Sequence, residues 1–240
     1  MSKPAPTNSP DDARLWRPDL VYAALLLAAA IACITVLGAE NGLLANEYGL
    51  GAAGLFVVFG LFTIATGFPH PVFGYVSMDR VAQVMSILIL GPVDAAWVNG
   101  LASFIFPWQR LRLGVSFPMV LTAALNNAGL MIFVVLGAGL LYQYLGGPVP
   151  IHALDPGTGL LLLALIVSMQ IINDAGMMII VYLRKGSPLS VFNPFTSVVE
   201  FVSGAAGIVL AIAFANYTMP EFTLILAVLV AGMLVIMQYA

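Results

Sequence analysis

The feature that most constrains the fold is a series of long apolar runs separated by short polar segments. Six runs are close to the roughly 20 residues that an α-helix needs to cross a bilayer. They are Leu20–Ala39, Leu50–Phe68, Phe117–Leu145, Leu160–Leu183, Thr196–Tyr217 and Phe222–Tyr239. Only 8% of the 240 residues are charged, whereas an ordinary soluble domain has about 25%. The sequence therefore predicts an all-α, polytopic membrane helix bundle in contact with the lipid bilayer.

The stretch from Val76 to Pro107 is too long for one ordinary span and short for two. Gly91 and Pro92 lie near its middle, where proline breaks the helical hydrogen bonds and glycine permits a tight turn. We therefore predict a hairpin of two short helices, which can stop within the membrane if protein surrounds them. The chain then has about eight transmembrane helices, of which the third and fourth are short.

The positions of the basic residues support this hairpin and give an orientation. With eight helices, every Lys and Arg falls on the same side, and the loops on the other side have none. These residues are Lys3, Arg14, Arg17, Arg80, Arg110, Arg112, Arg184 and Lys185. Because cytoplasmic loops are enriched in Lys and Arg, we expect an N-in/C-in, multi-pass protein of a bacterial inner (cytoplasmic) membrane.

The two ends of the chain carry separate expectations. Residues 1–19 contain Pro, Ser, Asp and Arg but no apolar core, so we expect a disordered cytosolic tail rather than a signal peptide. Residues 20–240 are expected to form a single transmembrane domain. The last apolar run stops near Ala240, at the expected cytoplasmic end of its helix. Either the protein ends there or it continues into a cytoplasmic domain.

Five polar residues in the predicted fifth and sixth helices are expected at one depth, near the middle of the membrane. They are Asn126, Asn127, Gln170, Asn173 and Asp174. Gln170, Asn173 and Asp174 have the i, i+3, i+4 spacing that places them on one helix face. One interpretation is a site for a small polar ligand, with Asp174 as its ionisable centre. The alternative is an interhelical hydrogen-bond clasp, worth about 0.6 kcal/mol per contact.

A second polar group is expected nearer the cytoplasm. Arg80 is the one basic residue expected to enter the bilayer, and burying an unpaired guanidinium is costly. We therefore predict that Arg80 pairs with Glu200 or Asp79, either as a structural ion pair or as a switch. Glu200 shares a helix face with small residues that suit packing against a neighbour. These are Ser197, Gly204, Gly207 and Ala211.

Several classes of function lack the residues they need. The single cysteine, Cys33, excludes an intrachain disulfide and a cysteine-based metal site or iron–sulfur cluster. The two histidines, His70 and His152, lie in different predicted loops, so we expect no haem, no other cofactor and no metal. No nucleotide-binding loop or catalytic constellation is present, so we expect no enzyme in these residues. The net charge of −3 does not suggest a nucleic-acid partner.

Four short segments resemble a known family of membrane sensory regions. They are Phe73–Arg80 (FGYVSMDR), Leu88–Trp97 (LILGPVDAAW), Ala124–Gly129 (ALNNAG) and Ile172–Asn173. They resemble the multi-pass N-terminal regions that precede GGDEF, HD-type phosphohydrolase or histidine-kinase domains. The resemblance extends over roughly Leu50 to Ala215, and the chain departs from the family pattern at Asp79-Arg80 and Asp174.

The resemblance implies a sensory input module for bacterial signal transduction, including cyclic-dinucleotide signalling, coupled to a fused or associated cytoplasmic output domain. Its partners would then be an unknown small ligand and, as a further candidate, a second copy in a homodimer. The same sensory regions are similar in helix arrangement to the substrate-binding subunits of energy-coupling-factor transporters. The alternative function is therefore a solute-binding subunit of such a transporter, or another small-solute transporter.

Overall fold

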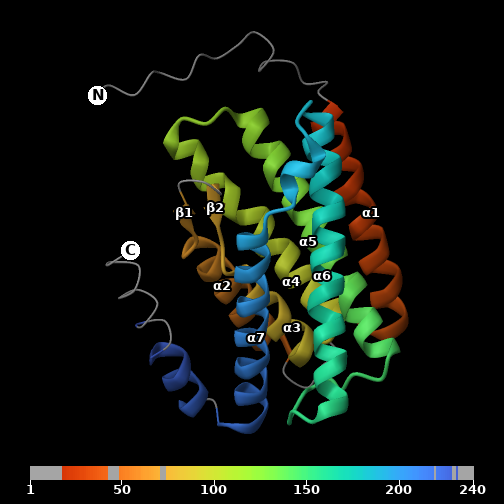
Figure 1. The fold of residues 1–240 in the computed structure, drawn as a ribbon, viewed down its shortest axis with the longest axis vertical. Coiled ribbons are helices and arrows are strands. Elements are labelled where there is room, and N and C mark those ends of the chain that lie inside the picture. The colour runs from red at the N-terminus through yellow and green to blue at the C-terminus, as the bar shows by residue number, and fades with distance from the viewer. Residues whose placement is uncertain (1–17, 43–48, 71–73, 219, 229–230, 232–240) are drawn as a thin grey trace.

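A computed structural model describes residues 18–42, 49–70, 74–218, 220–228 and 231 (Figure 1). The chain is a series of helices interrupted by one pair of short strands. The elements are α1 (Pro18–Asn41), α2 (Gly49–Ala65), β1 (Phe68–His70), β2 (Gly74–Val76), α3 (Asp79–Leu90), α4 (Pro92–Ile105), η2 (Phe106–Leu113), α5 (Phe117–Tyr144), α6 (Pro156–Leu183), η3 (Pro188–Val191) and α7 (Pro194–Asn216). Residues 220–228 are also helical.

Four helices, α1, α5, α6 and α7, are long and apolar enough to cross a membrane. The shortest of them, α7, has 23 residues, which corresponds to about 35 Å and exceeds the roughly 30 Å of a bilayer's hydrocarbon core. These helices coincide with four of the predicted runs. The helix α2 is apolar but has only 17 residues, and the last predicted run, Phe222–Tyr239, lies partly outside the described residues.

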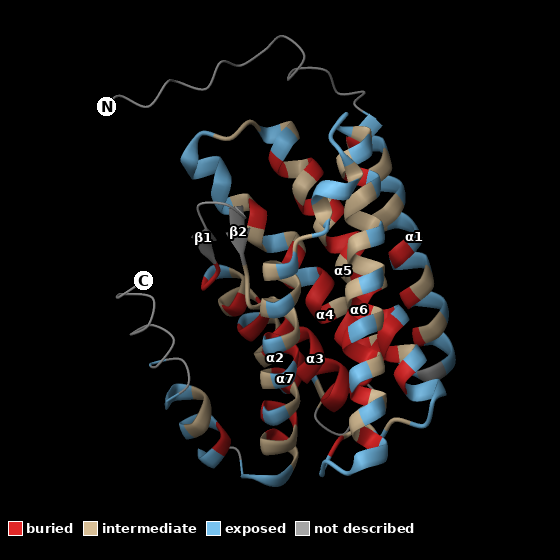
Figure 2. Cartoon of the chain, viewed as in Figure 1, coloured by how far each residue is buried: buried red, intermediate tan, exposed pale blue. Residues whose placement is uncertain are grey.

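The helices α3 and α4 form the hairpin predicted from Gly91 and Pro92. Gly91 has a φ of 84°, a left-handed conformation that glycine adopts without steric cost. Pro92 occupies the first turn of α4, where its missing N–H is not needed. All residues of α3 from Arg80 to Leu90 are buried, and α3 and α4 lie at the centre of the bundle (Figure 2). Helix α3 is therefore enclosed by protein, and so is the part of α4 that follows Gly91.

The structure corrects several predicted boundaries. The second helix ends at Ala65 instead of continuing to Phe68, and the third begins at Asp79 instead of Val76. Between them β1 and β2 pair antiparallel, with Pro69 opposite Tyr75. Proline cannot continue the helix and pushes the preceding residue towards an extended conformation, so this short segment is extended within a chain that is otherwise helical, as predicted.

Further boundary corrections lie at the start of the chain and at the end of α4. Helix α1 begins at Pro18, so the last two residues of the predicted 1–19 tail are helical. The rest of that tail lies outside the described residues. Helix α4 ends at Ile105, and Pro107 belongs to the 3-10 helix η2.

The predicted small-residue face of α7 packs closely against two neighbours. A Cβ atom on Gly207 would lie 2.7 Å from the carbonyl oxygen of Val81 in α3. One on Gly204 would lie 2.9 Å from Cδ1 of Ile166 in α6, and Ala211 is fully buried. Larger side chains at the two glycines would clash, so these residues set how near α7 approaches α3 and α6.

The described basic residues outside the helix bundle's interior gather at one end. They are Arg110 and Arg112 in η2, and Arg184 and Lys185 after α6. These segments lie at the end where α1 begins (Figure 1), and Nε of Arg184 is 3.4 Å from Oδ2 of the buried Asp19 in α1. We call this the basic end. The opposite end, where α3 turns into α4 and α5 leads into α6, is the turn end.

Candidate ligand-binding cavity

A partly open cavity of about 360 Å³ lies among the helices in the half of the bundle nearer the basic end. Its polar lining consists of Ser77, Asp79, Ser103, Arg110, Asn127, Asn173, Thr196 and Glu200. Asn127 and Asn173 are each about ten residues, or about 15 Å, from the basic end of their helices, whereas Arg110 is in η2 at that end. The lining therefore extends from the basic end towards the middle of the bundle. The volume is within the range of small-molecule sites.

The start of α7 presents two of these side chains to the cavity. Asn193 is the N-cap, and its side-chain oxygen accepts a hydrogen bond from the backbone N–H of Phe195 at 3.0 Å. Pro194 follows in the first turn, as is common at helix starts. The cap fixes where α7 begins. Thr196 and Glu200 are then four residues apart and lie on one helix face, which lines the cavity.

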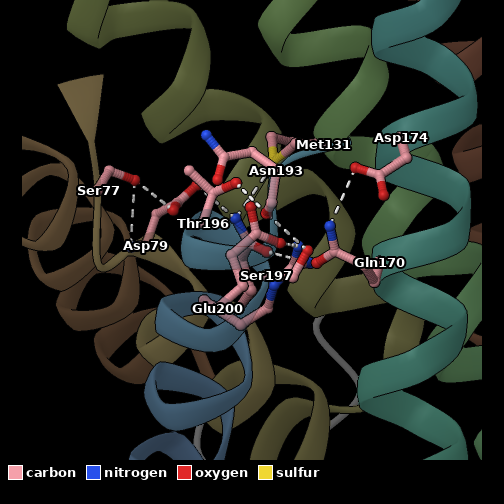
Figure 3. Close-up of polar contacts among 11 residues, drawn as sticks. Ser77, Asp79, Met131, Gln170, Asp174, Asn193, Thr196, Ser197 and Glu200 are labelled. Atoms are coloured by element: carbon pink, nitrogen blue, oxygen red, sulfur yellow. Dashed lines mark hydrogen bonds and ion pairs between the residues drawn. The ribbon is translucent and has the colours of Figure 1, made fainter. Parts of the chain in front are cut away.

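A chain of polar contacts links α3 to α7 beside the cavity (Figure 3). The hydroxyl of Ser77 and the amide Nε2 of Gln83, the latter at 2.7 Å, both donate to the carboxylate of Asp79. Gln83 also accepts a hydrogen bond from Nη1 of Arg80 at 3.1 Å. Nη2 of Arg80 is ion-paired with Glu200. The predicted contact between Arg80 and Glu200 is thus present, and Asp79 is joined to it through Gln83.

Burial separates the positive from the negative charges of this chain. The side chain of Arg80 is only 4% exposed, whereas that of Glu200 is 25% exposed. Asp79 and Glu200 both line the cavity, and Arg80 does not. A buried guanidinium needs hydrogen-bonding partners to offset its desolvation, and Arg80 has them. The cavity therefore meets two carboxylates, with the neutralising cation behind them.

The five polar residues predicted for the fifth and sixth helices do not form one cluster. Asn127 and Asn173 line the cavity, and neither side-chain amide makes a hydrogen bond to a residue in the described part of the chain. Gln170 donates to Asp174 at 3.0 Å within α6 (Figure 3), and neither residue belongs to the cavity lining. Asn126 is buried and also outside the lining, and its Oδ1 has no hydrogen-bond partner.

The structure instead joins parts of the two predicted groups into one site. Asn127 and Asn173 from the first group share the cavity with Asp79 and Glu200 from the second. Sequence reasoning missed Gln83, although its spacing from Asp79 and Arg80 is the i, i+4 and i, i+3 of neighbours on a helix. It also missed the lining residues Ser77, Ser103, Arg110 and Thr196, whose roles depend on which helices pack together.

No described group of three or more His, Cys, Asp or Glu side chains is placed to hold a metal ion. No family model matches the chain, and no curated protein or solved structure matches it either. The case for a function therefore depends on the cavity and its chemistry.

Proposed function

We propose that this chain is a membrane-embedded module that binds a small polar ligand and serves as the sensory input of a bacterial signalling protein. The observation that carries the proposal is the polar cavity inside an otherwise apolar helix bundle. Residues that only hold helices together bond to one another. Here the amides of Asn127 and Asn173 face open space and bond to no described residue.

The proposed orientation places the basic end in the cytoplasm, because cytoplasmic loops are enriched in Lys and Arg. With eight helices, both termini are then cytoplasmic, in a bacterial inner membrane. The cavity lies in the cytoplasmic half of the bundle, and the exposed Arg110 stands at its rim. The ligand would enter from the cytoplasmic side.

The route from ligand to output runs through α7. Glu200 of α7 lines the cavity and is ion-paired with Arg80 of α3. A ligand that binds Glu200 competes with that pair and favours a different placement of α7. A ligand can shift such an equilibrium only by its difference in affinity for the two arrangements. The chain after α7 would carry the shift to a fused or associated cytoplasmic output domain.

A solute-binding subunit of an energy-coupling-factor-type transporter is the second candidate. One observation favours it: α6 and α7 approach closely at Ile166 and Gly204, on the turn-end side of the cavity residues Asn173 and Glu200. A transporter opens its binding site to one side of the membrane while the other side is closed, and it alternates between the two states. The two candidates differ in whether the bound compound crosses the membrane.

The first experiment measures thermal unfolding of the purified chain in lipid nanodiscs with a panel of small polar compounds. Binding to the folded state raises the melting temperature. We expect at least one compound to do so in wild type and in Asn126→Leu, but not in Asn173→Leu, which places an apolar group in the cavity. If both variants respond equally, or no compound has an effect, the cavity is not a ligand site.

The second experiment tests the compound that binds, in proteoliposomes that contain the chain. A sensor binds it without carrying it across the membrane. Accumulation of the compound inside the vesicles, lost in Asn173→Leu, would replace the sensory proposal with the transport alternative.

A further inference from the structure

The negative charges of the carboxylates that line the cavity are not fully balanced by basic residues. No Lys or Arg nitrogen among the described residues forms an ion pair with Asp79. Its two carboxylate oxygens accept hydrogen bonds only from neutral donors, namely the hydroxyl of Ser77 and the amide of Gln83. Each carboxylate oxygen has two lone pairs, so Asp79, which lines the cavity, retains acceptor capacity.

Glu200 has unused capacity as well. Its Oε2 atom is paired with Arg80, and no described residue bonds to its Oε1 atom. Arg80 also donates to Gln83 and is almost completely buried. One guanidinium thus stands behind two carboxylates, which leaves the inner part of the cavity with an excess of one negative charge.

The rim of the cavity has the opposite charge. Arg110 belongs to η2, lines the cavity and is exposed to the surroundings. No described acidic residue forms an ion pair with it. Asn127 and Asn173 lie about 15 Å in from the basic end, with free amide donors and acceptors. The lining therefore combines an excess of negative charge inside with a free positive charge at the rim.

We infer that the cavity takes a small zwitterion, whose ammonium group is held by Asp79 and Glu200 and whose anionic group faces Arg110. This inference rests on the proposed ligand-binding role of the cavity and names the class of ligand. A bound ammonium offsets the cost of desolvating a carboxylate that the protein leaves unpaired. It also donates hydrogen bonds to oxygens with free lone pairs, while the amides accommodate the rest of the ligand.

The test uses probes that match in length and differ in charge: 4-aminobutyrate, butylamine, butyrate and butanol. Binding to the purified chain in nanodiscs is measured by calorimetry at concentrations up to about 10 mM, which detects millimolar affinity. We expect 4-aminobutyrate to bind most tightly, butylamine more weakly, and butyrate and butanol not at all. Binding of butyrate or butanol at least as tight as that of the amines would overturn the inference.

Three variants assign the charges. Asp79→Asn should weaken the binding of 4-aminobutyrate about 30-fold or more, because it removes one partner of a desolvated charge pair. Asp94→Asn is the matched control, because Asp94 is also an acid in the first turn of a short helix but does not line the cavity. It should bind normally. Arg110→Gln should lower the affinity for 4-aminobutyrate to that for butylamine and leave the affinity for butylamine unchanged.

The outcomes separate this inference from the proposed function. If butyrate or butanol binds, and Asn173→Leu abolishes that binding, the cavity is a ligand site and only the charge assignment fails. If no probe of any charge binds, and the wider panel of polar compounds also fails, both fail. Unchanged 4-aminobutyrate binding in a folded Asp79→Asn protein, checked by circular dichroism, also overturns the inference.

Discussion

The two halves of this bundle are built from the same helices but packed in opposite ways. Towards the turn end, side chains and backbone meet closely at several positions: a Cβ on Gly139 of α5 would lie 2.7 Å from Cβ of Pro92. The backbone N–H of Ile151 also bonds to the carbonyl of Leu88 at 3.1 Å. Towards the basic end the helices enclose a cavity lined by acids and amides.

This difference in packing indicates which half of the bundle can rearrange. A close-packed half has few alternative arrangements, because interiors packed at crystal-like density transmit strain instead of absorbing it. In the basic half, an ion pair between Arg80 and Glu200 joins α7 to α3, and Glu200 also lines the cavity. The packed half would act as a fixed frame, and the basic half as the part that responds.

The largest expected loss of stability follows from breaking the ion pair that borders the cavity. Arg80→Ala leaves Glu200 partly buried and without its cation, which should cost about 3–5 kcal/mol of unfolding free energy. Chemical unfolding in mixed micelles measures it, with Arg112→Ala as the exposed control, expected to change stability by less than about 0.5 kcal/mol. A loss below about 1 kcal/mol for Arg80→Ala would show that the pair does not hold α7 to α3.

The packed half should respond to added volume. Gly139→Val places methyl groups against Pro92 and should cost about 1–3 kcal/mol or more, because a filled interior has no room for them. Gly51→Ala in α2 is the control, since nothing lies within 4 Å of the added Cβ. It should be neutral or stabilising by about 0.5–1 kcal/mol. Equal stability of both variants in the same unfolding assay would show that the interior around Gly139 is not closely packed.

Asp174 tests how far the responsive region extends along α6. Its carboxylate bonds to Gln170 and lies outside the cavity lining, so Asp174→Asn should weaken ligand binding by no more than about tenfold, or about 1.4 kcal/mol. Calorimetry on the purified variant measures this. Complete loss of binding would instead make Asp174 the ionisable centre of the site, as the sequence alone predicts.

The smallest effect concerns a capping residue at the turn end. Hydrogen bonds from the backbone N–H and hydroxyl of Thr158, and from the N–H of Gly157, hold the pKa of Asp155 below its ordinary value. A carboxyl with a lowered folded-state pKa stabilises the fold above its ordinary pKa, and this contribution is lost as the pH falls towards the lowered value. The melting temperatures of wild type and Asp155→Ala should therefore differ slightly at neutral pH, and the difference should shrink as the pH falls below the ordinary pKa of an aspartate. A constant difference across this range would contradict the assignment.

Much of the fold could be predicted from one-dimensional information. Run length predicted the helices that are long enough to cross a membrane, and Gly91-Pro92 predicted the α3–α4 hairpin. The cost of burying a guanidinium limited the partner of Arg80 to Glu200 or Asp79. The cavity could not be predicted in the same way. Depth along a helix does not say which helices are neighbours. That α7 packs on α3 follows from the fit of Gly207 against Val81.

We conclude that the basic half contains an open polar cavity, whereas the interior around Ala96 in the turn half is closely packed. Single cysteines at Asn173 and at the fully buried Ala96, introduced in a Cys33→Ala background, test it with a water-soluble, membrane-impermeant thiol reagent. We predict that Asn173→Cys reacts in inside-out vesicles but not in intact cells, and that Ala96→Cys reacts in neither. An unreactive cysteine at 173, or one that reacts only from outside the cell, would contradict the account.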